Sequence, residues 1–278
     1  MPTVRAMAGQ LHSSPSSIHA ALSQLEQAGA IEFETRGRAG AFLVDRSLGR
    51  LWTMAEGGPL VTALPLASSP RYEALATAIK QVLTRAGLDV FFIFARGSRQ
   101  RLRAMHEGRC HLAVMSSFAA SEVCGPDDCI VADLPPNSYN TGHRVFYVAD
   151  RKVAVPLRVI VDQHSADQQL LTALEFADLN VVLVPAMASQ IVRMLESGQA
   201  DTAVWTADEM ATRAPTGVLD RELSATARDR VGDRDTRAVF VGKAVDAAIL
   251  RATTSVLDFH EVERIQDEVL TGRLVAEY

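Results

Sequence analysis

The distribution of apolar residues divides the chain into a short N-terminal part and a longer part in which apolar residues are spaced differently. From Pro59 onward, short unbroken apolar runs rich in Val, Ile and Phe alternate with segments that carry apolar residues at helical spacing. Unbroken runs are typical of strands that helices cover on both faces, as in parallel sheets. Strands are predicted at 60–66, 90–95, 111–116, 158–161, 181–184, 201–205 and 238–241, and helices at 70–86, 99–107, 166–176, 188–197, 244–257 and 262–271. The pattern predicts an α/β fold over residues 59–278.

The α/β part contains an internal repeat. The segment 105–117 (MHEGRCHLAVMSS) resembles 195–207 (LESGQADTAVWTA), and a strand, a serine-bearing loop and a helix precede each copy, at 64–83 and 159–176. Ligands of open α/β sheets bind beyond the carboxyl ends of the strands, where helix N-termini offer free N–H groups and a positive dipole end. Two such lobes predict a domain of the type II periplasmic-binding-protein kind, which closes by a hinge around a small anionic molecule.

The candidate effector-binding residues lie where predicted strands end and the next helices begin. They are Ser68, Ser69, Arg71, Arg96, Ser98, Ser116, Ser117, Ser165, Asp167, Trp205 and Thr206. Serine hydroxyls and neighbouring backbone amides can hold an anion, although each serine taken alone is explained as a plain helix N-cap. Arg71 and Arg96 could each pair with a carboxylate or phosphate through two hydrogen bonds. Asp167 could accept an ammonium group, or only complement a helix dipole.

The first 46 residues show the order helix, tight turn, helix, hairpin. Apolar spacing predicts a short helix at 3–11, and a second helix that begins after a serine cap and a proline and ends at Gly29. Two strands, at 31–34 and 41–44, enclose a turn with two glycines and two arginines. This order is that of a winged helix-turn-helix DNA-binding domain over residues 1–46, although the first helix of such a domain is missing here. Residues 47–58 are expected to be a linker.

The candidate DNA-binding residues lie on the second helix and in the turn between the strands. They are Ser14, Ser16, Ser17, His19, Ser23, Arg36, Gly37, Arg38 and Gly40. The N-terminal residues of a recognition helix face base edges in the major groove, while a wing carries arginines toward phosphates or a minor groove. The alternative is a helical hairpin whose arginine-bearing turn is merely solvated.

Five stretches, spread from the hairpin to the last two residues, carry a resemblance to a known family. They are AIEFETRGRAGAFLV (30–44), ALPLASSPRYEALATAIK (63–80), SADQQLLT (165–172), GQADTAVW (198–205) and the terminal EY. Over essentially its whole length the chain resembles the YhfZ-type GntR-like transcriptional regulators, which join a winged-helix head to a binding-protein-like C-terminal domain. The resemblance implies ligand-responsive control of transcription, with double-stranded DNA and a small effector molecule as partners.

Two departures from the GntR pattern bear on DNA binding. GntR-type heads begin with another helix, and their recognition helices usually carry arginines. At those positions this chain has Ser16, Ser17, His19 and Ser23. Fewer cations predict weaker and less salt-sensitive DNA binding. Two heads acting together on a two-fold site compensate through a high effective concentration, so a homodimer is expected.

Composition and missing motifs narrow the function further. The 278 residues carry a net charge of −5, and no apolar run approaches the roughly 18 residues of a membrane span, so no membrane partner is expected. An odd count of three cysteines and the lack of a signal-peptide pattern favour a cytoplasmic protein. Phosphate-loop, dinucleotide and nucleophile-elbow motifs are missing, and Cys110, His111, Cys124 and Cys129 lack the paired spacing of a zinc site. The expectation is therefore no cofactor, no metal and no catalytic residue.

Two alternatives stay open. One is an enzyme on the same two-lobed scaffold, with the N-terminal part as an interaction module. The other is a ligand-binding protein whose N-terminal part does not bind DNA. A base hydrogen-bonded to a nucleophile in the cleft would favour the enzyme.

Overall fold

The computed structural model describes residues 3–37, 40–56, 58–152, 154–213 and 217–278. The chain divides into two compact units. The N-terminal unit comprises residues 1–60 and 81–91, and the two-lobed unit comprises residues 61–80 and 92–278. Arg38, one of the two arginines of the predicted DNA-binding turn, lies outside the described residues.

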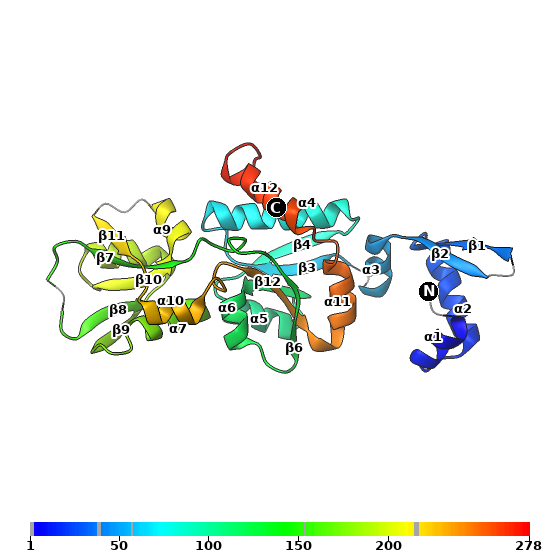
Figure 1. Cartoon of the computed structure of the whole chain (residues 1–278), viewed down its shortest axis with the longest axis horizontal. Helices are drawn as coiled ribbons and strands as arrows, with labels where there is room; N and C mark the ends of the chain where they lie inside the picture. Colours follow the sequence, from blue (N-terminus) through cyan, green and yellow to red (C-terminus); the bar gives the residue numbers. More distant parts are fainter. Residues whose placement is uncertain (1–2, 38–39, 57, 153, 214–216) are drawn as a thin grey trace. The chain divides into compact units, whose positions relative to one another are not determined.

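The N-terminal unit has the predicted order of two helices and a hairpin (Figure 1). Its elements are α1 (Val4–Gln10), α2 (Pro15–Gln27), β1 (Ile31–Thr35), β2 (Ala41–Arg46) and α3 (Leu48–Glu56). Ser14 caps α2 as predicted, because its hydroxyl accepts a hydrogen bond of 3.1 Å from the Ser17 backbone N–H. Beyond the other end of α2, Gly29 has a φ of +65°, which glycine adopts without steric strain. The strands β1 and β2 pair antiparallel.

Residues 47–58, expected as a linker, contain the helix α3. The Arg50 guanidinium donates hydrogen bonds to the carbonyls of Ala28 and Gly29 just beyond α2, at 3.1 and 3.2 Å. A cation is favourable there, since the last carbonyls of a helix carry partial negative charge. The Trp52 side chain is buried, and its indole N–H donates to a backbone carbonyl at 3.0 Å. Leu48, Leu51 and Trp52 stand at helical spacing, so the sequence does carry a signal for this helix, and the expectation of a linker was wrong.

Gly49 allows α3 to lie close to Gly87. A Cβ atom at Gly49 would lie 1.7 Å from the Gly87 carbonyl oxygen, a backbone atom that no rotamer change can move. We therefore expect Gly49→Ala to lower the midpoint of thermal unfolding, at a cost of about 1–3 kcal/mol. Circular dichroism during heating measures this change.

Gly9→Ala is the matched control for Gly49→Ala. Gly9 lies in α1, and no atom lies within 4 Å of a Cβ built there. Alanine at this position should leave stability unchanged or raise it by about 0.5–1 kcal/mol. Equal responses of the two variants would contradict the close approach of α3.

In the described residues, two five-stranded sheets form two lobes, which belong to the second unit except for residues 60 and 90–91 at the starts of two strands. The first has the strand order β4-β3-β5-β12-β6 and the second has β9-β8-β10-β7-β11. The strands are β3 (Leu60–Leu64), β4 (Val90–Phe94), β5 (Leu112–Ser116), β6 (Asp128–Asp133), β7 (His143–Val148), β8 (Leu157–Val161), β9 (Val181–Pro185), β10 (Thr202–Thr206), β11 (Val218–Arg221) and β12 (Ala238–Lys243). The two orders are equivalent, and β5 and β10, the two copies of the sequence repeat, are the central strands of their sheets.

Both sheets are mixed, whereas the sequence pattern predicted parallel ones. β3 is parallel to β5, and β8 is parallel to β9 and β10, as expected. β12 is antiparallel to β5, and β7 is antiparallel to β10. These two strands follow the crossovers between the lobes, so each enters its sheet from the opposite end. β6, β7 and β11 escape prediction because charged residues at their ends shorten their apolar runs.

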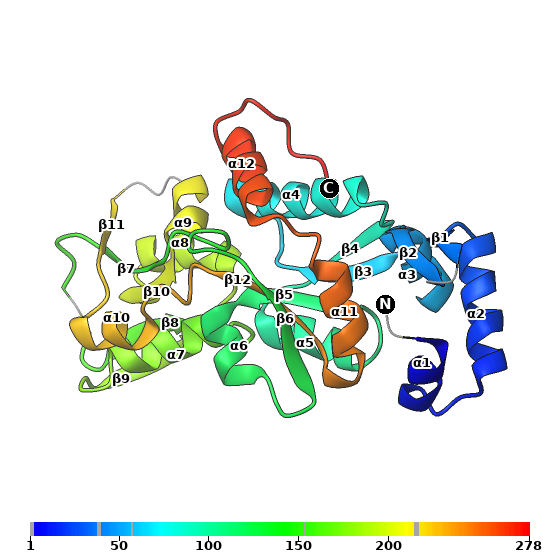
Figure 2. The ribbon, with the colours of Figure 1, turned by 45° about the vertical axis from the view of Figure 1, so that its right-hand side comes forward.

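Helices cover both faces of each sheet. In the first lobe, α4 and α12 lie on one side of the sheet and α5 and α6 on the other; in the second, α8 and α9 lie opposite α7 and α10 (Figures 1 and 2). The helices are α4 (Pro70–Arg85), α5 (Ser98–His106), α6 (Ser117–Val123), α7 (Ala166–Glu175), α8 (Ile191–Glu196), α9 (Ala207–Arg213), α10 (Ala225–Val231), α11 (Ala247–Thr254) and α12 (Phe259–Leu270), with 3-10 turns at Ala188–Gln190 and Ala244–Asp246. Among these described helices, none has the length and apolarity that crossing a membrane requires.

The two lobes share apolar contacts. Phe118 of α6 is fully buried among second-lobe residues that include Val159 and Leu171. The Arg234 guanidinium lies 5.1 Å from the centroid of the Phe118 ring, at cation–π distance. In the opposite direction, Ala166 at the start of α7 packs into the apolar cluster of the first lobe. The lobes therefore lie against each other along α6 and α7.

The two crossover segments, at 134–142 and 232–237, bond to each other. The Tyr139 backbone N–H donates to the second segment at 2.8 Å. The Asn140 side-chain amide donates to the Asp235 carbonyl at 3.0 Å. Two paired segments between two lobes are the usual construction of a hinge.

Candidate functional site

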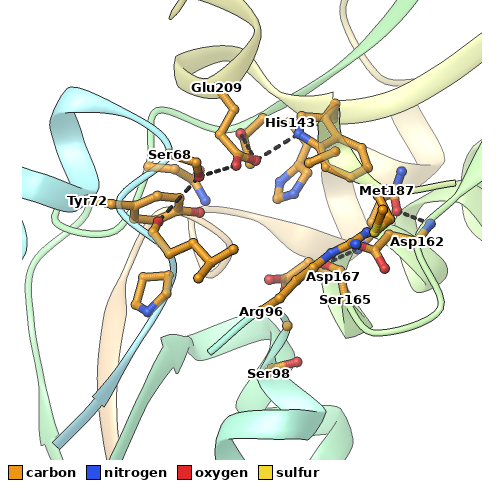
Figure 3. A pocket seen from close by; sticks show the side chains of 18 of the residues that line it. Ser68, Tyr72, Arg96, Ser98, His143, Asp162, Ser165, Asp167, Met187 and Glu209 are labelled. Atoms are coloured by element: carbon orange, nitrogen blue, oxygen red, sulfur yellow. Dashed lines mark hydrogen bonds and ion pairs between the residues drawn. The ribbon is translucent and has the colours of Figure 1, made fainter. Parts of the chain in front are cut away.

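A cavity of about 380 Å³ lies between the two lobes, beyond the carboxyl ends of their strands (Figure 3). Its volume falls in the range of small-molecule sites, about 300–1,000 Å³. Both lobes contribute to its lining, as the repeat predicted. The sequence-predicted residues that line it are Ser68, Arg96, Ser98, Ser165, Asp167, Trp205 and Thr206.

Four predicted residues do not line this cavity. They are Ser69, Arg71, Ser116 and Ser117. The Ser69 hydroxyl accepts a hydrogen bond from a backbone N–H in the first turn of α4, at 3.4 Å, so it is a helix cap. The Arg71 guanidinium donates to Asp208 at 3.4 Å and to a backbone carbonyl at 2.7 Å, outside the cavity. Ser116 caps α6, and its hydroxyl donates at 2.6 Å to Asp167, which does line the cavity.

Glu209 of α9 is the point where donors from both lobes meet. One carboxylate oxygen accepts a hydrogen bond from the Ser68 hydroxyl of the first lobe, and Figure 3 shows these side chains pointing toward each other. The other oxygen accepts from the Trp205 indole N–H at 2.7 Å and from the Thr206 hydroxyl at 3.1 Å. The donors that the sequence assigned to an effector anion therefore hold a carboxylate of the protein itself.

Arg96 and Asp162 form a second tie between the lobes. The Arg96 guanidinium donates twice to one oxygen of Asp162, at 2.9 and 2.5 Å, and once to the Ala186 carbonyl at 3.3 Å. Gly97, beside this pair, allows the lobes to approach, because a Cβ there would lie 2.1 Å from the His164 carbonyl oxygen. Arg96, predicted to bind the effector, is thus neutralised by the opposite lobe.

Arg101 of α5 is the buried cation of the cavity wall, with only 3% of its surface exposed. Its Nε donates to the Val114 carbonyl at 2.7 Å, and its two terminal nitrogens donate to the Ala95 carbonyl at 2.8 Å and to the Tyr139 hydroxyl at 2.9 Å. These bonds use three of its five N–H groups, and every acceptor is neutral. Within the described part of the chain it has no ion pair. A buried charge without an ion pair is costly, which makes Arg101 a candidate for a ligand-binding residue.

Two buried titratable groups face the same cavity. Burial raises the pKa of Asp167, and the nearby His143 and the Ser116 hydroxyl offset only part of that effect. Burial acts to lower the pKa of His143, but its 2.7 Å hydrogen bond to Asp235 outweighs burial, so that the pKa is raised. The His143 backbone N–H also donates to Asp235, at 3.2 Å. This pair fixes the imidazole at the crossover between the lobes.

Aromatic side chains form an apolar wall of the cavity. The rings of Tyr72 and Tyr139 meet edge to face, with centroids 5.2 Å apart. Burial raises the pKa of Tyr139 to about 12 and raises that of Tyr72 well above its usual value, so both hydroxyls stay neutral. With Trp205 on the opposite lobe, these rings give the cavity flat apolar surfaces beside its charged groups.

Several lining residues were not among the sequence-predicted ones. They are Tyr72, Arg101, Tyr139, His143, Asp162 and Glu209. Asp162 follows the predicted strand 158–161 directly, and Glu209 lies one helical turn beyond the end of β10, so the strand-end rule already pointed at both. Arg101 is one of several arginines in its helix, and only the tertiary structure distinguishes it from the others.

The predicted DNA-binding residues of the N-terminal unit that the structure describes are all exposed. They are Ser14, Ser16, Ser17, His19, Ser23, Arg36, Gly37 and Gly40. The Arg36 guanidinium pairs with Glu34 at 2.9 Å and lies 5.3 Å from the centroid of the Phe42 ring. An exposed ion pair of this kind contributes little energy, so it does not hold Arg36 back from another partner.

No metal cluster is found within the described ranges, where no three His, Cys, Asp or Glu side chains converge on one point. The cysteines Cys110, Cys124 and Cys129 are free thiols, and none of them lines the cavity. Burial raises the pKa of both Cys110 and Cys124 to about 11, which keeps them protonated and unreactive.

Comparison with known proteins assigns the chain to a family. Residues 48–278 match the family described as the YhfZ C-terminal domain. The chain belongs to this family. The protein YhfZ of Escherichia coli K12 is 27% identical over 279 aligned residues, which span 100% of this chain and 91% of YhfZ. The crystal structure of YhfZ from Shigella flexneri has a TM-score of 0.68 and 25% identity, and covers 83% of this chain and 98% of that one.

The YhfZ-family fold is shared with two-lobed binding proteins. The periplasmic aliphatic sulphonate binding protein SsuA from Escherichia coli has a TM-score of 0.54 at 13% identity, covering 77% of this chain and 75% of SsuA. At this identity the likeness concerns the fold alone. It confirms the binding-protein-like, two-lobed architecture that the repeat predicted, while the winged helix-turn-helix stays a prediction.

Asp167 and Asp201 are buried aspartates whose surroundings shift the carboxyl pKa in opposite directions. The same substitution should therefore change the free energy of unfolding in opposite directions. Burial raises the pKa of Asp167, whose ionised form is therefore disfavoured in the folded state. At Asp201, hydrogen bonds from Arg158 outweigh burial and lower the pKa. At pH 7 we expect Asp167→Asn to raise the free energy of unfolding by about 1 kcal/mol, because the amide keeps an acceptor for Ser116 without a charge. Asp201→Asn should lower it by about 2 kcal/mol.

Urea unfolding at several pH values measures both effects. The native carboxyl of Asp167 keeps its proton longer than the unfolded one, so its charge reduces stability only as pH rises from the unfolded pKa through the raised pKa. The gain from Asp167→Asn should therefore vanish as pH falls to about 4. The stabilisation from Asp201 should be lost as pH falls through its lowered pKa. A loss of stability in both variants at pH 7 would contradict the assignment of Asp167 as an only partly compensated charge.

Proposed function

We propose that this protein is a cytoplasmic, ligand-responsive regulator of transcription. In this proposal the two-lobed unit binds a small molecule with an anionic group, and the N-terminal unit binds double-stranded DNA. The observation that carries the ligand part is the guanidinium of Arg101, which lines an interlobe cavity and meets only neutral acceptors. An oxyanion beside it would supply the missing counter-charge. The proposal assigns no catalytic step to the cavity.

The N-terminal unit supports the DNA part by what it exposes. The first turns of α2 expose serines and His19 to solvent. Arg36, in the hairpin that follows α2, is exposed as well. All six residues of β2 are also exposed, including Phe42, Leu43 and Val44. Exposed apolar side chains gathered on one strand are typical of association surfaces, which fits the homodimer that we propose.

Ligand binding can control DNA binding only through differential affinity for two arrangements of the lobes. Both lobes contribute side chains to the cavity, so a ligand that bridges them favours the closed arrangement. The helix α4 follows the cavity-lining Ser68, and its last residues, 81–85, already belong to the N-terminal unit. A continuous helix shared by the two units is a physical link along which a change in the cavity can reach the N-terminal unit. Coupling energies of this kind are typically about 1–3 kcal/mol.

A substitution at Ser68 should abolish the response to ligand. Leucine there would fill cavity space and remove the hydroxyl donor to Glu209. Ser117→Leu is the matched control, because Ser117 lies at the start of α6 and outside the cavity. Small carboxylates and phosphate esters are screened by thermal shift, and the best of them is titrated into a DNA-binding assay. We expect Ser68→Leu to weaken ligand binding at least about tenfold and Ser117→Leu to leave it unchanged. Equal binding by both variants would place the ligand elsewhere.

A substitution in the predicted wing should weaken DNA binding without affecting the ligand. Replacing both Arg36 and Arg38 with alanine removes cations that can neutralise phosphates, so affinity should fall for all DNA sequences alike. The slope of log affinity against log salt should flatten by about one for each phosphate that the variant no longer neutralises. Replacing Arg109 and Arg273, two exposed arginines of the two-lobed unit, controls for the change in net charge. If affinity and salt slope match the wild type, the wing assignment is wrong.

A further inference from the structure

The charged side chains of the cavity do not all neutralise one another. Arg96 is paired with Asp162 across the lobes, and His143 with Asp235. The remaining charged groups of the lining are two cations, Arg101 and Arg213, and two anions, Asp167 and Glu209. Within the described part of the chain none of these four forms an ion pair. The cavity therefore offers both a positive and a negative group that the fold itself leaves without a directly bonded counter-charge, although His143 and Arg101 lie near enough to Asp167 to favour its charged form.

The cationic side has donors to spare. Arg101 is buried and uses three of its five N–H groups, all on neutral acceptors. The Nε of Arg213, at the end of α9, is inaccessible to solvent and has no hydrogen-bond partner. Buried donors of this kind are costly unless an acceptor reaches them, and an oxyanion is the strongest acceptor available to a guanidinium.

The anionic side is held by neutral donors. Glu209 accepts from two hydroxyls and an indole N–H, and Asp167 accepts from the Ser116 hydroxyl. These bonds orient both carboxylates but bring no positive charge to them. Figure 3 shows Glu209 and Asp167 on different sides of the same cavity. A ligand that carried only negative charge would lie beside two carboxylates, which repel it in a site of low dielectric.

We propose that the ligand is a zwitterion of amino-acid size, with a carboxylate that meets Arg101 and an ammonium group that meets one of the two carboxylates, Glu209 or Asp167. The inference rests on the proposed function, because it assumes that the interlobe cavity is the effector site. It narrows the ligand class that the sequence indicated, since an anionic group alone satisfies only the cationic side. The aromatic rings of Tyr72 and Tyr139 leave room for an apolar side chain between the two charged ends.

Matched sets of small molecules test the proposal on the full-length protein. The first set is the twenty protein amino acids and the straight-chain ω-amino acids of three to six carbons. The second set is the same skeletons without the ammonium group, and the third is the same skeletons without the carboxylate. Inorganic phosphate and succinate represent ligands with negative charge only. Isothermal calorimetry on the compounds that raise the unfolding temperature should find a zwitterion that binds at least about tenfold more tightly than either of its truncated counterparts.

Isosteric variants locate the ammonium group. Glu209→Gln and Asp167→Asn keep the shape and an acceptor oxygen but remove the charge. The variant of the carboxylate that holds the ammonium group should weaken binding of the zwitterion about tenfold or more and should change binding of the deaminated counterpart much less. Glu222→Gln is the control, because Glu222 is an exposed residue that pairs with Arg228 outside the cavity. Loss of the zwitterion preference in either cavity variant, with Glu222→Gln unchanged, supports the proposal.

The outcomes separate this inference from the proposed function. If phosphate, succinate or a deaminated acid binds more tightly than every zwitterion, and Ser68→Leu abolishes that binding, the cavity is an anion site and the zwitterion inference fails alone. If no zwitterion of the first set binds, the inference is also overturned. If a zwitterion binds as expected but does not change DNA affinity, the ligand class stands and the regulatory function fails.

Discussion

The cavity depends on the burial of one guanidinium. Arg101 bonds to Ala95 after β4, to Val114 in β5 and to Tyr139 in the crossover, so that one side chain fixes three segments from distant parts of the sequence. Its planar fork suits this task, because each N–H points at a different acceptor. Since all the acceptors are neutral, the charge is positioned without being cancelled. The interaction that organises the wall of the site is therefore also the one that leaves it able to attract an anion.

The two lobes are already tied together by direct contacts. Ser68 bonds to Glu209, Arg96 to Asp162, and Ser116 to Asp167, and in each pair the first residue belongs to the first lobe. A bridging ligand consequently adds to an arrangement that the protein favours by itself. Only the difference in its affinity for the closed and open arrangements can be used for regulation. Ties through buried, charge-assisted hydrogen bonds keep the closed geometry well defined, which is what selection between similar small molecules requires.

The parts of the architecture that depend on neighbouring residues were predictable from the sequence. The parts that depend on residues far apart in the sequence were not. The repeat indicated two equivalent lobes, and the serine-bearing loops before helices located Ser68 and the cap Ser165 at the cavity, because caps and strand ends depend on neighbouring residues. The antiparallel strands β7 and β12 follow from crossovers between the lobes, which no local pattern records. His143 lies 92 residues from its partner Asp235, and a histidine without a neighbouring acid in the sequence gives no sign of such a pair.

Buried charges without an ion-pair partner reduce stability, so their presence in a folded domain requires a functional explanation. In the described part of the chain Asp167 forms no ion pair, and nearby His143 and Arg101 offset only part of the rise in its pKa that burial causes, whereas Arg158 pairs directly with Asp201. Around the cavity the fold pairs Arg96 with Asp162 and His143 with Asp235, but among the described residues it leaves Arg101 and Asp167 without an ion pair. Burying Arg101 and Asp167 without ion pairs lowers the free energy of unfolding. A bound ligand of matching charge would stabilise the folded state by pairing with them. Under the zwitterion proposal, a ligand without one of the two charges would leave a buried group uncompensated and would therefore bind more weakly. Selectivity for charge pattern is therefore a direct consequence of leaving these residues unpaired.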